Sequence, residues 1–292
     1  MPDNPQPTND AVFALPDHGV VELRGPDAMK FAQAQFMSDV GSLEVGHWHW
    51  SGWLTPKGRV VALFAAVRIA EDCLWLVLPD AEPAPLAEAL SRYVFRSKVK
   101  VAARDDLQVL GAFATPELTA STRIAGDEVS GIELDMSADG GARRMLVGTH
   151  SAAANDAGVK KWAAFDMTHG LPRLPDEQSS QWTPQQLSLE RLHAFSVKKG
   201  CYPGQEIVAR THFLGKAKRG LMLVEGDRPL IPGAQLREIG SGTGLGTLVS
   251  CARASEGRYL ALVVAPLDRE PVGLGVDGIE VREATLLEGL AR

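Results

Sequence analysis

The order of its short apolar segments constrains the fold of this chain more than any other feature. β-type patterns recur over the first 113 residues, at 20–23, 48–54, 59–69, 73–78, 98–103 and 107–113. One helix is expected to begin after Gly25-Pro26-Asp27, and a second follows Pro85. The order strand, helix, strands, helix, strands indicates an α+β unit with a mostly antiparallel sheet. Residues 98–103 and 107–113 alternate like a pair of strands within it.

Residues 113–217 carry a weaker signal that hints at a second copy of this unit, although the sequence shows no clean internal repeat. Segments 132–136 and 144–147 look like strands around a glycine turn, and 151–165 is expected to be helical. Thr183-Pro184-Gln185-Gln186 predicts a helix start, because Thr183 can cap, Pro184 suits the first helical position and Gln186 can reach back. We therefore predict a second, divergent α+β unit.

Glycine-punctuated short strands follow residue 217, and several such strands suggest a small barrel. The predicted domains are 1–112, 113–217 and 218–292. Gly273 to Gly278 formally fits G-x-G-x-x-G, but only fourteen residues follow it. A dinucleotide site needs a helix and a second strand after the motif, so this segment is predicted to be a turn.

Ser196 to Thr211 is the stretch most suggestive of function. Pro203-Gly204 predicts a turn, Gly200 allows unusual backbone angles, and a helical pattern begins at Gln205. Cys201 is thus expected in a tight loop ahead of a helix N-terminus, where lysines and the helix dipole favour the thiolate. A lone cysteine is also commonly a small buried apolar residue. His169, His193 or His212 could pair with it as a base.

Charge and cysteine content limit the class of protein. The net charge is −6, so the chain is not expected to bind nucleic acid directly, although its basic residues cluster near 57–59, 92–104 and 198–219. Three widely spaced cysteines, Cys73, Cys201 and Cys251, form no metal or disulfide pattern and fit a reducing compartment. The N-terminal 21 residues contain acids but no Lys or Arg, which does not fit a targeting signal. We expect a cytoplasmic protein without a metal site or membrane association.

The Cys201 segment also carries a resemblance to a known family. Lys199-Gly200-Cys201-Tyr202-Pro203-Gly204-Gln205-Glu206 resembles the K-G-C-Y-x-G-Q-E signature of the YgfZ family. Leu54 to Val60 is similar to that family's L-D-P-K-G-R segment, and Arg92 to Val99 is similar to its R-Y-x-x-R-S-K-V segment. Weaker landmarks, at Gly170-Leu171-Pro172 and Val208 to Thr211, extend the resemblance over most of the chain.

The resemblance implies an aminomethyltransferase-like folate-binding fold, with two related α+β units and a C-terminal β-barrel. It implies a protein that binds tetrahydrofolate or a derivative and serves iron–sulfur protein assembly or repair, and through it tRNA modification. Partners would then be iron–sulfur proteins or their assembly machinery. Cys201 would be the functional thiol. The candidate folate-binding residues are Lys57, Arg59, Arg96, Lys98, Lys199, Gly200, Tyr202, Gln205, Glu206 and Arg210.

Two alternatives stay open at this point: a folate-dependent one-carbon transferase, and a non-catalytic module that binds a partner through its positive surface. Aminomethyltransferases carry an acidic pair near the position of Pro56-Lys57-Gly58-Arg59. They also carry Glu-Ala-Gly where this chain has Thr168-His169-Gly170. Aminomethyl transfer is therefore not expected, and whether the protein is an enzyme stays open.

Overall fold

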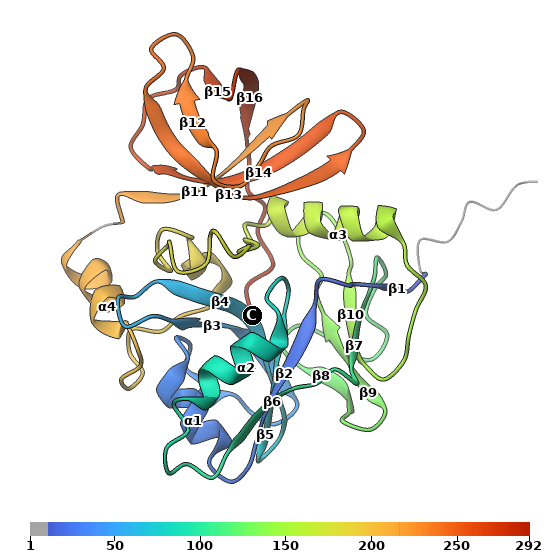
Figure 1. Cartoon of the computed structure of the whole chain (residues 1–292). Coiled ribbons are helices and arrows are strands. Elements are labelled where there is room, and N and C mark those ends of the chain that lie inside the picture. The colour runs from blue at the N-terminus through green and yellow to red at the C-terminus, as the bar shows by residue number, and fades with distance from the viewer. Residues whose placement is uncertain (1–10, 216) are drawn as a thin grey trace, which may run out of the picture.

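The computed structural model describes residues 11–215 and 217–292 and has three parts (Figure 1). Two five-stranded sheets lie below a closed six-stranded barrel in this view. The predicted polar tail at residues 1–10 and the basic residue Lys216 lie outside the described residues. The mixed helix and strand content and the C-terminal barrel confirm the predicted fold class.

The first sheet has the strand order β3-β4-β5-β2-β6, and its neighbours are antiparallel. Its strands are β2 (Gly19–Arg24), β3 (His47–Leu54), β4 (Val60–Ala70), β5 (Cys73–Leu78) and β6 (Lys100–Ala103). Helices α1 (Ala28–Gln35) and α2 (Pro83–Ser91) cover one face, where Leu74 and Leu76 are buried. Trp75 and Val77 enter the main core on the other face. Because side chains alternate between two covered faces, β5 is apolar throughout.

The second sheet has the order β1-β7-β10-β9-β8. Its strands are β1 (Phe13–Ala14), β7 (Gln108–Ala112), β8 (Ile124–Asp127), β9 (Gly131–Asp135) and β10 (Arg144–Gly148). Helix α3 (Asp156–Thr168) packs on it, and a β-carbon at Gly111 would lie 2.9 Å from the Trp162 ring. The helix begins later than the predicted residue 151 because Asn155 caps it, accepting a hydrogen bond from the Gly158 amide at 3.0 Å.

The strands predicted at 98–103 and 107–113 form, but their predicted pairing is wrong. β6 pairs with β2 in the first sheet, whereas β7 pairs with β1 and β10 in the second. The chain crosses between sheets at Arg104, whose guanidinium binds Glu22 of β2 at 2.7 Å and Asp106 at 2.8 Å. The first sheet therefore ends before β7, whereas the sequence predicts the first unit to end at residue 112.

The segment that carries Cys201 belongs in space to the first sheet, although the sequence places it in the second unit. The Val60 amide donates to the Trp182 carbonyl at 2.8 Å, and the Ser196 amide donates to the Met37 carbonyl at 2.8 Å. Helix α4 (Gln205–Leu214) follows the loop as predicted. Thus residues distant in sequence from β3 and β4 cover the end of that hairpin.

The predicted capping bonds of Thr183 and Gln186 both form. The Thr183 amide donates to Gln186 Oε1 at 3.0 Å, and the Gln186 amide donates to Thr183 Oγ1 at 3.3 Å. A long helix does not follow, and the chain makes only the 3-10 helix η2 (Leu189–Leu192). Ser188 and His193, at its two ends, adopt left-handed backbone angles that interrupt helical geometry.

The C-terminal barrel closes in the order β11-β14-β13-β12-β15-β16. Its strands are β11 (Arg219–Gly226), β12 (Gln235–Glu238), β13 (Gly244–Ser255), β14 (Arg258–Pro266), β15 (Leu274–Val276) and β16 (Ile279–Ala284). The segment 273–278 contains β15 and the turn that leads into β16, with positive φ at Asp277 and Gly278. This confirms the predicted turn.

The last residues leave the barrel and run back to the sheets, where the C-terminus lies in Figure 1. The Leu287 amide donates to the Thr168 carbonyl at 2.8 Å, and Trp50 Nε1 donates to the Leu290 carbonyl at 2.8 Å. This segment thus fastens the barrel to both sheets. Among the described helices, none is both long and apolar enough to cross a membrane.

Candidate functional site

Lys199, in the predicted motif, is a buried helix cap. Its Nζ donates to the carbonyls of Gln33, Phe36 and Ser38 at 2.6, 2.6 and 2.8 Å. These carbonyls lie in and after the last turn of α1, where helical carbonyls lack partners. Burial lowers the pKa of Lys199 to about 8, so the ammonium form still predominates at pH 7 and supplies three donors. Lys199 therefore fixes the start of the Cys201 loop on α1.

Two further motif residues hold the same loop. The Tyr202 hydroxyl donates to the Ser196 carbonyl at 3.0 Å, and Gln205 Nε2 donates to the Lys199 carbonyl at 3.1 Å. Gly204 has a φ of +79°, and a β-carbon there would lie 2.6 Å from the Gly58 Cα. The turn between β3 and β4 at Gly58 and the Cys201 loop are thus in contact. Gly200 has neither a positive φ nor a close neighbour that would require glycine.

Cys201 is exposed and borders an open hollow of about 490 Å³. The hollow is also lined by Pro56, Tyr202, Gly204, Gln205, Glu206 and Ala209. The thiol precedes α4 by a few residues, near the positive end of that helix. Its position favours chemistry with an approaching partner rather than a role in packing.

The remaining predicted folate contacts are spread over the surface around this loop. Lys57, Glu206 and Arg210 are exposed near it, and Arg96 and Lys98 are exposed between α2 and β6. The Arg59 guanidinium instead binds the protein, donating to the Gln181 carbonyl at 2.7 Å and to Gln186 Oε1 at 3.1 Å. None of the ten predicted contacts lines the larger cavity described next.

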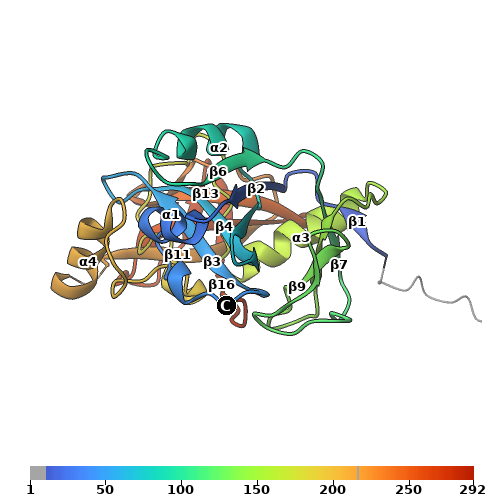
Figure 2. The same cartoon turned by 90° about the horizontal axis from the view of Figure 1, so that it is seen from below.

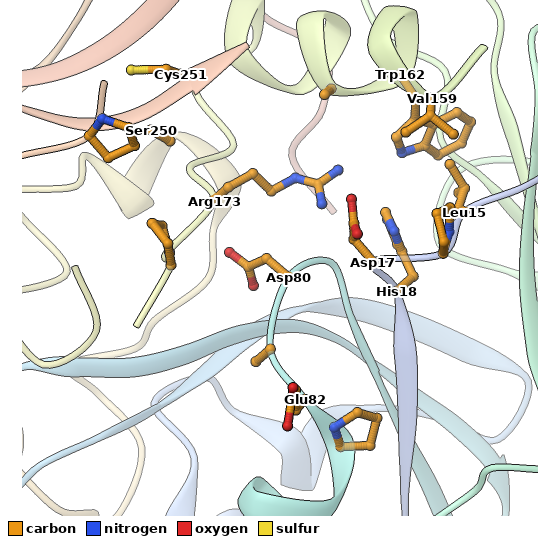
Figure 3. Close-up of a pocket in the computed structure, with 16 residues that line it drawn as sticks. Leu15, Asp17, His18, Asp80, Glu82, Val159, Trp162, Arg173, Ser250 and Cys251 are labelled. Atoms are coloured by element: carbon orange, nitrogen blue, oxygen red, sulfur yellow. The ribbon is translucent and has the colours of Figure 1, made fainter. Parts of the chain in front are cut away.

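A cavity of about 590 Å³ lies where the two sheets meet the barrel (Figure 3). The β1–β2 connection, the β5–α2 connection, α3 and β13 supply its walls. Its labelled lining residues are Leu15, Asp17, His18, Asp80, Glu82, Val159, Trp162, Arg173, Ser250 and Cys251. Figure 3 shows carboxyl groups, the Arg173 guanidinium and the His18 ring gathered in the middle, with Trp162 on one side and Cys251 on the other. Both its volume and its mixed apolar and polar lining are typical of a small-molecule site.

The titratable groups of this cavity are strongly perturbed. Burial raises the pKa of Asp80 to about 6, against the opposing effect of Arg173. Burial lowers the pKa of His18 well below its usual value, and Arg173 and Arg143 add to this effect. His18 is therefore a neutral ring at pH 7, with its plane at 78° to Trp162 and a centroid distance of 6.5 Å. Burial also raises the pKa of Cys251 to about 12, which keeps that thiol protonated.

Arg173 is held in place by groups behind the cavity wall. It donates to the Pro79 carbonyl and, at 2.6 Å, to Asp166, which also accepts from the fully buried Arg143 at 2.6 Å. Three buried polar atoms lining the cavity have no partner among the described residues: His18 Nδ1, Arg173 Nε and Ser250 Oγ. Buried polar atoms normally find partners, so these favour a polar ligand here.

Neither a metal site nor a Cys–His pair is formed by residues 11–215 and 217–292. No three His, Cys, Asp or Glu side chains are placed to hold a metal ion there. No histidine in this part of the chain hydrogen-bonds to Cys201; His169 instead bonds to the carbonyls of Phe165 and Asp139 at 2.7 and 2.8 Å. The thiol therefore lacks an adjacent histidine base.

Comparison with known proteins identifies relatives along almost the whole chain. A protein from Klebsiella pneumoniae strain 342, named tRNA-modifying protein YgfZ, is 28% identical over 287 residues, covering 89% of this chain and 86% of its own. The protein of the same name from Escherichia coli O157:H7 is 28% identical over 295 residues, covering 91% and 90%. The chain is thus similar to YgfZ proteins along about nine-tenths of its length. No protein-family model matches it.

The fold of this chain is also found in a solved transferase structure. The glycine cleavage system aminomethyltransferase T from Bartonella henselae superposes with a TM-score of 0.70 at 15% sequence identity. The match covers 94% of this chain and 84% of that chain. It confirms the aminomethyltransferase-like fold that the resemblance predicted.

The YgfZ motif led to the Cys201 loop but not to the cavity. His18, Asp80, Trp162, Arg173 and Cys251 lie in five separate segments, and none belongs to the motifs quoted above. One signal could have identified Asp80: a carboxylate placed directly after a strand of six buried residues and a proline. The other four carry no pattern that distinguishes them from ordinary core or turn residues.

Proposed function

We propose that this chain binds tetrahydrofolate or a derivative in the cavity between the sheets and the barrel. In the cytoplasm it would assist the assembly or repair of iron–sulfur proteins on which tRNA modification depends. The name of its relatives supports the role in tRNA modification, and the fold of the aminomethyltransferase supports the folate. The observation that carries the proposal is the cavity itself, whose lining residues include three buried polar atoms without a partner among the described residues.

The cavity fits the head of a folate better than its tail. A pterin is flat and presents a row of N–H donors along one edge, which the carboxylate of Asp80 can accept. Trp162, Val159 and Leu15 supply apolar surface for its faces. The glutamate tail is anionic, and Asp17 and Glu82 also line the cavity. We therefore infer that the pterin enters and that the tail stays at the mouth.

Cys201 would act apart from the folate, because it does not line this cavity. An exposed thiol on a loop held by Lys199 and Tyr202 suits transient contact with a client protein. The folate site and the thiol would then be two separable requirements of one activity. We therefore expect Cys201→Ser to lose function while it still binds folate. Full function without the thiol would favour the non-catalytic binding module instead.

A folate-dependent one-carbon transferase is the second candidate, and one observation favours it. Asp80 provides, inside the cavity, the acidic group that is absent near Lys57. With its pKa raised to about 6, it could exchange a proton near neutral pH. This candidate requires folate-dependent turnover of an amine substrate and loss of turnover in Asp80→Asn. If the protein binds folate but shows no turnover, the transferase function is excluded and only the folate-binding accessory function remains.

Calorimetric titration with tetrahydrofolate tests the proposal. We expect Asp80→Asn to weaken binding roughly tenfold, because a charge-assisted hydrogen bond becomes a neutral one. Asparagine retains an oxygen that can accept from the Leu174 amide, so the local fold should survive. Lys57→Ala and Arg96→Ala serve as matched controls, and their binding should be unchanged. Weakened binding in these controls with normal binding in Asp80→Asn would instead locate the folate beside the Cys201 loop. No binding at about millimolar ligand would remove the proposal altogether.

A further inference from the structure

The connection between α2 and β6 displays an unusual combination of side chains. We call this segment, Arg92–Lys100, the basic loop. Phe95 is 86% exposed and Tyr93 is 39% exposed, although neither aromatic ring gains from contact with water. Arg92, Arg96, Lys98 and Lys100 are exposed around them, and the segment contains no Asp or Glu.

Most of the cationic side chains in the basic loop form no ion pair with a carboxylate of the described residues. Within the described residues, Arg92 is its one member with an ion-pair partner, Glu88 of α2 at 2.6 Å. Lys98 and Lys100 are exposed on either side of the partly buried Val99, just before and at the start of β6, whose backbone is extended. Residues two apart on such a backbone lie about 6–7 Å from each other. The loop therefore presents a short row of positive charges next to an exposed ring.

The two aromatic residues of the loop are held differently. The Tyr93 ring packs edge-on to Trp53, with a centroid distance of 5.7 Å and an interplanar angle of 82°. Phe95 has no aromatic partner in the described part of the chain, and only its amide is engaged, donating to the Tyr93 carbonyl at 3.1 Å. Tyr93 thus anchors the loop, and Phe95 offers a free ring face.

The basic loop borders the same helix as the Cys201 loop. The Lys98 amide donates to Asp27 Oδ2 at 2.6 Å, at the start of α1, whereas Lys199 caps the end of α1. Trp53, which packs on Tyr93, forms a β-bridge with Phe36, whose carbonyl accepts from Lys199. Figure 2 shows α1 in the foreground of this face, between α2 and α4. The thiol and the basic loop therefore flank one helix.

We propose that the basic loop binds single-stranded RNA, with Phe95 stacked on a base and Arg96, Lys98 and Lys100 on the phosphates. A single free ring suits a flat base, because stacking needs one face only. A protein partner would instead be expected to meet a contiguous apolar pocket around the aromatic anchor. The net charge of −6 opposes binding of nucleic acid over the whole protein surface. The proposed RNA contact is therefore limited to the locally positive basic loop. This inference does not depend on the proposed folate function.

Fluorescence anisotropy with labelled single-stranded oligouridine, in the absence of folate, tests the base-stacking part. We expect Phe95→Ala to weaken binding about tenfold and Phe95→Trp to retain it. Phe213→Ala is the matched control, because Phe213 is also an exposed aromatic residue, at 66%, but lies on α4. The exposed Phe95 supports no core contact, so the variants should fold normally. Equal affinity of Phe95→Ala and wild type would overturn the proposal.

The salt dependence of the same titration tests the phosphate part. Lys98→Ala and Lys100→Ala should each weaken binding and reduce the slope of log K against log salt by roughly 0.7. Arg228→Ala, on the barrel, should change neither quantity. No binding to oligouridine, or tighter binding to a duplex of the same length, would overturn the proposal. If the protein binds polyglutamate but not oligouridine, and Phe95→Ala weakens that binding, the proposal is also overturned. That result would indicate an acidic protein partner.

Discussion

Asp166 lies between two guanidinium groups in the wall behind the cavity. Its carboxylate accepts from Arg143 and Arg173 at 2.6 Å each, and the side chains of Asp166 and Arg143 are almost fully buried. The Arg143 guanidinium carbon also lies 4.1 Å from the centroid of the Trp162 ring and 4.3 Å from that of the Phe165 ring. One carboxylate therefore compensates two cations and keeps Arg173 pointing at the cavity.

We predict that Asp166→Asn destabilises the protein by about 3–5 kcal/mol, because it leaves buried charges without a counterion. Chemical denaturation measures this change in the free energy of unfolding. Asp156→Asn, an exposed substitution in the first turn of α3, should cost less than about 1 kcal/mol. Equal effects of the two substitutions would contradict the role given to Asp166.

Folate affinity should depend on pH through Asp80. Its pKa is raised to about 6, so the carboxylate that accepts the pterin donors is present above pH 6 and becomes protonated below it. We expect affinity to be constant near pH 7.5 and to fall by up to tenfold per pH unit below 6. Burial lowers the pKa of His18 well below its usual value, which opposes its protonation in this range. Titrations of wild type and Asp80→Asn between about pH 5.5 and 7.5 measure this, and a pH dependence that persists in Asp80→Asn would argue against Asp80.

Functional residues that are neighbours in sequence can be recognised from a motif, whereas those brought together by folding cannot. Cys201 was identified because its neighbours in sequence form a recognisable motif. The cavity groups were not, because Asp17 and His18, Asp80, Trp162, Arg173 and Cys251 meet only after five elements pack together. The sequence predicts Lys199 as a folate contact for a similar reason. The carbonyls that accept from its Nζ lie more than 160 residues earlier in the chain, and no local pattern connects them to it.

At the scale of elements, Lys199 is the link between α1 and the Cys201 loop. We predict that Lys199→Met destabilises the protein by about 2–4 kcal/mol, because three carbonyls lose a buried charged donor. Lys198→Met is the matched control, since Lys198 is exposed and should cost less than about 0.5 kcal/mol. Urea denaturation separates the two cases. A loss in Lys198→Met as large as in Lys199→Met would contradict the capping role.

Strands and turns were more predictable than their partners. The strands β3 and β4, the helix after Pro203-Gly204 and the β15–β16 turn follow from local patterns, because turn residues and alternation act over a few positions. The pairing of β6 and β7 did not follow, because alternation shows that a segment is a strand but not which edge it joins. The helix expected after Thr183 stopped early, because two residues nearby take left-handed angles that no local pattern announced.

At the scale of the whole molecule, two sites lie on different parts of one fold. The cavity lies where both sheets meet the barrel, and Cys201 lies in the loop that covers the end of the β3–β4 hairpin. The barrel joins the arrangement twice, through Ser250 and Cys251 of β13 in the cavity wall and through the C-terminal segment bound to Trp50. The sequence predicts folate contacts beside Cys201, whereas the position of the cavity favours a folate site separate from the thiol.

The location of the folate is the central claim, and a crystal structure of the protein soaked with a stable tetrahydrofolate derivative tests it most directly. We predict electron density for the pterin inside the cavity, with its donor edge on Asp80 and its face toward Trp162. Density for the pterin beside Cys201, in the hollow between Pro56 and Glu206, would contradict the account.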